Sequence, residues 1–120
     1  RDVMARSADR DGIAREWTGG FERTFRAAER IEAGAGPLVD RAADAYLELL
    51  AAEPDTFVAI RHGEATAREV TERAGAALAG ALDAGELADD LVEAGINPGT
   101  TADLVAGGLF VALERGRVSV

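Results

Sequence analysis

One stretch of the sequence, between Asp55 and Glu69, spaces three side chains that can move protons or bind cations. Asp55, His62 and Glu69 follow one another at intervals of seven residues, and residues seven apart fall on nearly the same face of an α-helix. A carboxylate and an imidazole on one face can exchange protons or bind a cation. Gly63 would let a ligand approach the backbone closely. In the simpler interpretation, Asp55 is only a helix cap after Pro54 and His62 is an ordinary residue.

A second stretch, Asn97 to Asp103, combines a turn with the start of a helix. The N–H groups and dipole of a helix N-terminus favour phosphate binding, so Asn97, Gly99, Thr100 and Thr101 are candidate phosphate or nucleotide ligands. Asp103 could hold a divalent cation that bridges the phosphates. The alternative is a capping arrangement from Thr100 to Asp103.

The composition and the absence of several motifs exclude some classes of functional site. The chain has no cysteine, so thiol catalysis and cysteine-bound zinc are excluded. We find no nucleophile–base arrangement, Walker loop or dinucleotide fingerprint. The net charge of −9 disfavours nucleic acid as a partner. Among the arginines only Arg61 is singled out as a phosphate ligand, because it adjoins His62.

Helices must position these residues, since Ala and Leu are abundant and no stretch alternates with a period of two. We expect segments near 3–17 and 21–31, and helices near 38–52, 56–81, 86–93 and 101–113. The predicted core includes Leu49, Phe57, Ile60, Leu104 and Phe110. Gly107 and Gly108 lie inside the last predicted helix, where each costs about 1 kcal/mol, so they indicate close helix packing more than ligand approach.

Length and composition bound the class of protein. The 120 residues suffice for a single all-helical domain, 1–120. No apolar run is long enough to cross a bilayer, and we expect a cytoplasmic protein without a membrane partner. Because the first residue is Arg1, we expect a fragment or a processed product. An acidic chain without lysine is typical either of a salt-adapted, halophilic surface or of a GC-rich genome, and the sequence does not decide between them.

Three groups of residues, in this order, resemble the C-terminal region of triphosphoribosyl-dephospho-CoA synthases, most closely the archaeal-type members. They are Gly36-Pro37-Leu38, the segment from Pro54-Asp55-Thr56 to Arg61-His62-Gly63, and the segment from Asn97 to Leu104. The resemblance covers most of the chain and is weaker before Gly36. Members of that family are longer, and their N-terminal half carries acidic and histidine motifs that this chain lacks.

The resemblance implies an all-α fold, here a compact bundle of about five to six helices that forms part of a larger helical enzyme. It also implies that ATP gives its triphosphoribosyl group to dephospho-CoA and releases adenine, with Mg²⁺ on the triphosphate. His62 and Asp55 would then be catalytic, Asp55 and Asp103 metal ligands, and Arg61, Gly63 and the 97–101 turn phosphate ligands. The competing hypothesis is a non-catalytic helical interaction or assembly domain. A homodimer is left open.

Overall fold

The computed structural model describes residues 21–116 and 118, and the elements found there are all helices. The first comprises residues 21–33. It is followed by α2 (Leu38–Ala52), α3 (Thr56–His62), α4 (Glu64–Leu78), α5 (Ala84–Ala94) and α6 (Gly99–Glu114). The predicted all-α class is therefore confirmed. None of the described helices is long and apolar enough to cross a membrane. The predicted segment 3–17 lies outside the described residues.

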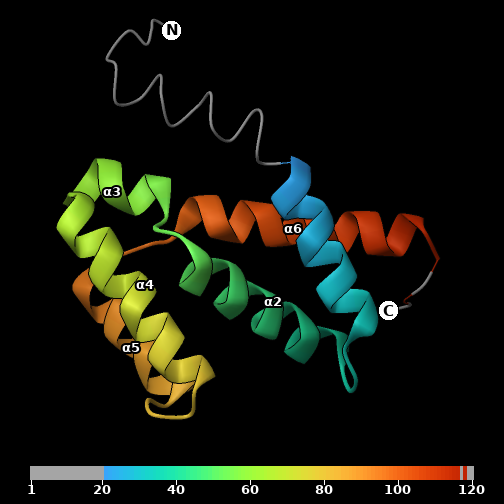
Figure 1. Cartoon of the computed structure of the whole chain (residues 1–120), viewed down its shortest axis with the longest axis horizontal. Coiled ribbons are helices and arrows are strands. Elements are labelled where there is room, and N and C mark those ends of the chain that lie inside the picture. The colour runs from blue at the N-terminus through green and yellow to red at the C-terminus, as the bar shows by residue number, and fades with distance from the viewer. Residues whose placement is uncertain (1–20, 117, 119–120) are drawn as a thin grey trace, which may run out of the picture.

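Helix α2 lies at the centre and separates two layers (Figure 1). On one side α4 and α5 lie along each other, and on the other side α6 crosses the helix of residues 21–33. Neighbouring residues of α2 face these two layers: Leu50 packs with Val70, Ala74, Leu87 and Leu91, whereas Leu49 packs with Ala27 and Val105. A helix buried on two sides needs apolar residues on two faces, which explains the Leu-rich end of α2.

The prediction of one helix over residues 56–81 is wrong, because the chain breaks at Gly63. Gly63 has φ = +98°, a conformation that only glycine adopts without strain, and it ends α3 and begins α4. The backbone therefore changes direction between His62 and Glu69. The seven-residue spacing therefore does not place Asp55, His62 and Glu69 on one helical face.

The predicted core is correct only in part. Leu49 is buried and Leu104 is partly buried, but Phe57, Ile60 and Phe110 are 37%, 56% and 63% exposed. The short helix α3 turns Val58 inward in place of Phe57 and Ile60. In α6, apolar residues occur on all sides, so periodicity could not identify the inner face, which carries Thr101, Val105, Gly108 and Ala112.

The two glycines of α6 let it approach the helix of residues 21–33 closely, as we expected from the sequence. A Cβ added at Gly108 would lie 2.7 Å from the Cβ of Ala27 and 2.9 Å from the backbone nitrogen of Ala28. A Cβ at Gly107 would lie 3.3 Å from Cγ2 of Thr24. Backbone, rather than a flexible side chain, stands in the way at Gly108, so that contact cannot be relieved cheaply.

This crossing predicts opposite effects for two Gly→Ala substitutions. Gly108→Ala should destabilise the protein by about 1–3 kcal/mol, because overpacking forces the two helices apart. Gly75→Ala is the matched control in α4: nothing lies within 4 Å of its added Cβ, and better helix propensity should stabilise it by up to about 1 kcal/mol. Urea denaturation of the two variants measures both effects. Equal stability of the variants would contradict the close crossing.

Candidate functional site

The side chain of Asp55 joins the N-termini of two helices that are distant in the sequence. Asp55 is buried and is the N-cap of α3, where its Oδ1 accepts a hydrogen bond of 3.0 Å from the N–H of Val58. Its Oδ2 accepts two hydrogen bonds of 2.7 Å, from the N–H and from the hydroxyl of Thr101 in the first turn of α6. A single carboxylate therefore satisfies backbone donors of both helices, whose dipoles both favour a negative charge there.

A second contact between the starts of α3 and α6, which together form a buried joint, lies closer to the surface. The hydroxyls of Thr56 and Thr100 lie 2.7 Å apart. Thr56 directly follows Asp55 in the sequence, and Thr100 directly precedes Thr101. Pro98, two residues before Thr100 in the sequence, is buried. The residues of the sequence motif 97–101 thus meet the start of α3, and the structure brings Asp55, Thr100 and Thr101 together.

Tyr46 of α2 lies near this carboxylate and keeps its proton. Burial raises the pKa of the Tyr46 hydroxyl to about 12, and the negative charge of Asp55 contributes in the same direction. The hydroxyl is therefore neutral and can donate a hydrogen bond at any physiological pH.

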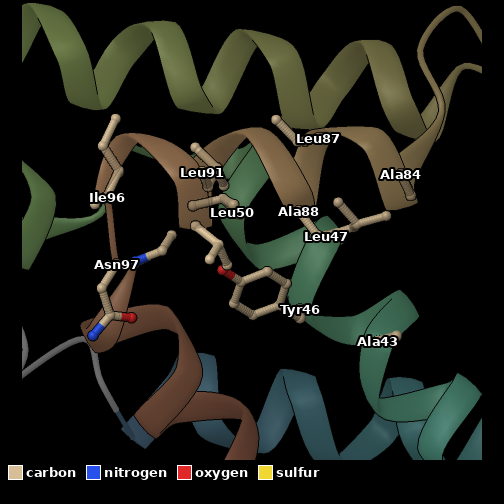
Figure 2. Close-up of a pocket in the computed structure, with 13 residues that line it drawn as sticks. Ala43, Tyr46, Leu47, Leu50, Ala84, Leu87, Ala88, Leu91, Ile96 and Asn97 are labelled. Carbon is tan, nitrogen blue, oxygen red and sulfur yellow. The ribbon is translucent and has the colours of Figure 1, made fainter.

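The phenol also borders a cavity of about 520 Å³ between α2 and α5. Its walls are mainly aliphatic, and the polar side chains that line it are those of Tyr46 and Asn97 (Figure 2). The aliphatic residues include Leu47, Leu50, Leu87, Leu91 and Ile96. Tyr46 is not among the predicted site residues, and no local sequence signal indicates this cavity.

The other predicted site residues lie apart from the buried joint. His62 is exposed at the last residue of α3, roughly 10 Å along the helix from its start at 1.5 Å per residue. Arg61 is also exposed, and its guanidinium carbon lies 5.5 Å from the centre of the Phe57 ring. Asp103 is exposed on α6.

The arrangement of carboxylates does not fit a magnesium ion held by the protein. Both oxygens of Asp55 already accept hydrogen bonds, so an ion could reach them only by displacing those donors. Across residues 21–116 and 118, no three His, Asp or Glu side chains are grouped so that the protein alone could hold a metal ion. The metal-ligand roles of Asp55 and Asp103 stay predictions.

At the start of α6, where we predicted phosphate binding, several backbone N–H groups already donate hydrogen bonds within the protein. Asp55 accepts from the N–H of Thr101, the N–H of Gly99 donates to the carbonyl of Asn97, and that of Ala102 donates to the carbonyl of Pro98. The buried carboxylate thus takes the position that the helix dipole offers to an anion. The phosphate-binding roles of Arg61, Gly63, Asn97, Gly99, Thr100 and Thr101 stay predictions.

Comparison with known proteins decides the family. The family model described as ATP:dephospho-CoA triphosphoribosyl transferase matches residues 1–119. The chain belongs to this family. A solved structure from Archaeoglobus fulgidus, described as that of a candidate triphosphoribosyl-dephospho-CoA synthase, superposes with a TM-score of 0.76 at 32% sequence identity. That match covers 96% of this chain but 50% of the archaeal one. No curated protein matches the chain. The family resemblance inferred from the motifs is therefore confirmed, and the chain spans half the length of this transferase-family relative.

The double role of Asp55 predicts a larger loss of stability than an ordinary cap would give. Asp83 provides the matched control, because it caps α5 by accepting one bond of 3.0 Å from the N–H of Glu86 at the surface. Asp83→Ala should cost about 1 kcal/mol. Asp55→Ala should cost on the order of 3 kcal/mol or more, because buried donors of two helices lose their acceptor. Chemical denaturation compares the two, and similar losses would show that the joint with α6 contributes nothing.

The raised pKa of Tyr46 predicts a pH dependence that absorbance can follow, because the chain contains one tyrosine. In the folded protein, phenolate absorbance should appear with a midpoint at about 12, against about 10 in denaturant. Since the folded pKa is raised, the contribution of Tyr46 to stability is complete below pH 10 and is lost as the pH rises towards 12. Coincident titration curves of folded and unfolded chain would refute the burial of this hydroxyl.

Proposed function

We propose that this chain forms part of an enzyme that transfers the triphosphoribosyl group of ATP to the 2′-hydroxyl of dephospho-CoA and releases adenine. The observation that carries the proposal is the match of the transferase family model over residues 1–119. The structural likeness at 32% identity supports it. Because the chain spans 50% of that relative, the proposal is that it supplies one portion of the active site. A cytoplasmic location is part of the proposal.

The reaction exchanges one glycosidic bond for another. The bond between C1′ of the ribose of ATP and N9 of adenine breaks, and a bond from C1′ to the acceptor oxygen forms. The acceptor hydroxyl loses a proton, and adenine gains one as it leaves. Such a transfer requires a group that accepts the first proton and a group that supplies the second.

Within this chain, we propose His62 for proton donation or for contact with phosphate, because its exposed imidazole is accessible to a substrate. Asp55 contributes by fixing the start of α6 relative to α3, since its hydrogen bonds hold Thr101 and leave no oxygen unengaged. Magnesium, when it arrives with ATP, would neutralise charge on the triphosphate.

The proposal predicts that adenine is released from ATP only when dephospho-CoA is present. Chromatographic detection of adenine and of the triphosphoribosylated product measures this, on the present chain and on any longer product of the same reading frame. His62→Ala should lower the rate of release by about 100-fold or more if its proton transfer is used, with little change in folding because the side chain is exposed. Glu72→Ala, at an exposed residue of α4 that belongs to no predicted site, is the control. Absence of adenine release in every form would favour the non-catalytic assembly hypothesis.

Asp103 allows a separate test of the metal prediction. Its side chain is exposed, so Asp103→Asn should leave the melting temperature nearly unchanged. If Asp103 contacts the metal, the substitution should weaken magnesium-dependent ATP binding by about 1–3 kcal/mol. Calorimetric titration of wild type and variant with ATP, with and without magnesium, measures the difference. Equal affinities would remove Asp103 from the site.

A further inference from the structure

We propose that the cavity between α2 and α5 receives an adenine ring, with the Tyr46 hydroxyl donating a hydrogen bond to a ring nitrogen and Asn97 contacting the edge of the base. This inference rests on the proposed function, because it assigns a place in this chain to one part of its nucleotide substrates. Both ATP and dephospho-CoA carry adenine, so the shared chemistry is the purine base.

The size and walls of the cavity suit a planar ring with apolar faces. Its volume of about 520 Å³ lies within the range of roughly 300–1,000 Å³ that is typical of small-molecule sites. Leucine side chains of α2 and α5 line it, among them Leu50, Leu87 and Leu91. Burying the faces of a purine against the exposed apolar side chains of the lining, such as Ala88 and Val92, removes apolar surface from water, which favours binding.

The charge of the lining decides which end of a nucleotide can enter. No Arg, Asp, Glu or His is among the residues that line the cavity, so nothing there would compensate a triphosphate removed from water. An uncharged base incurs no such cost. The ring therefore enters, and the phosphates remain outside.

The two polar side chains match the hydrogen-bonding pattern of adenine. Adenine offers ring nitrogens as acceptors and the N6 amino group as a donor, and a carboxamide pairs with both on one edge. The neutral phenol of Tyr46 adds a donor. In Figure 2 the hydroxyl lies on the edge of the ring nearer Asn97.

Asn97 lies at the exposed end of the cavity. Asn97 and Pro98 belong to the lining and lead directly into α6 at Gly99. Asn97 is exposed, whereas Leu50, Leu87 and Leu91 are buried. The edge of the base that pairs with Asn97 would thus lie at this exposed end of the cavity, near the start of α6.

Calorimetric titration of the chain with adenosine tests the proposal, because adenosine carries the base without phosphate or metal. We expect saturable binding, with purine riboside weaker because it lacks the N6 amino group that would donate to the carboxamide oxygen of Asn97. Tyr46→Phe keeps the ring and removes the hydroxyl, and Asn97→Leu removes the carboxamide. Each should weaken adenosine binding by about three- to tenfold, as expected for one neutral hydrogen bond. Val39→Thr, at an exposed residue of α2 outside the cavity, should change nothing.

Competition identifies the source of the base. Adenosine should compete with either ATP or dephospho-CoA, whichever places its adenine here, and Tyr46→Phe should raise the KM of that substrate alone. Absence of adenosine binding, or equal binding by wild type, Tyr46→Phe and Asn97→Leu, would overturn the proposal and leave the groove as a packing surface.

The two proposals fail separately. Adenine release with unchanged KM values in Tyr46→Phe and Asn97→Leu would refute the adenine cavity and retain the transferase. Adenosine binding that depends on Tyr46 and Asn97, without any adenine release, would refute the transferase and retain the cavity.

Discussion

The arrangement of α3 and α6 depends on one buried carboxylate. Asp55 accepts three hydrogen bonds, one from α3 and two from Thr101 of α6. A helix of seven residues such as α3 is too short to be stable alone in water, so its stability must come from its caps and contacts. Asp55 supplies the cap, and the same side chain fixes the neighbouring helix.

Helix α2 gives this joint a rigid support. Leu49 and Leu50 are adjacent in the sequence and buried in different clusters, so α2 packs against both layers at once. Tyr46 lies one turn earlier and borders both the cavity and the surroundings of Asp55. The candidate adenine cavity and the capped helix ends are therefore positioned by the same helix. A change in the packing of α2 would alter both.

Much of the architecture could be predicted from the sequence, because the helical signals are local. The bounds of α2 match the predicted 38–52, and Gly107 and Gly108 indicated the close crossing correctly. The break at Gly63 was underestimated, since a single glycine inside an apolar pattern is compatible with a continuous helix until its φ is known. Phe57, Ile60 and Phe110 were assigned to the core because hydrophobicity does not reveal which face of a short or uniformly apolar helix turns inward.

The candidate site was harder to predict, because it depends on contacts between distant segments. The sequence predicts helix starts at Pro54-Asp55-Thr56 and at the turn of residues 97–101, and both predictions are correct. No local sequence pattern indicates that one carboxylate accepts hydrogen bonds from both helix starts, or that Tyr46 lies near it. A tyrosine on an amphipathic helix is usually part of a core. Only the spacing of α2 and α5, which both pack against α4, makes it part of a cavity wall.

The hydrogen bonds between Asp55 and Thr101 also constrain the order in which the nascent polypeptide can fold. The two residues are 46 positions apart, and the intervening segment contains α3, α4 and α5. On the ribosome, Asp55 emerges long before its partner, so its second carboxylate oxygen stays hydrated until Thr101 has left the exit tunnel. Docking of α6 is then the event that dehydrates this carboxylate and closes the loop.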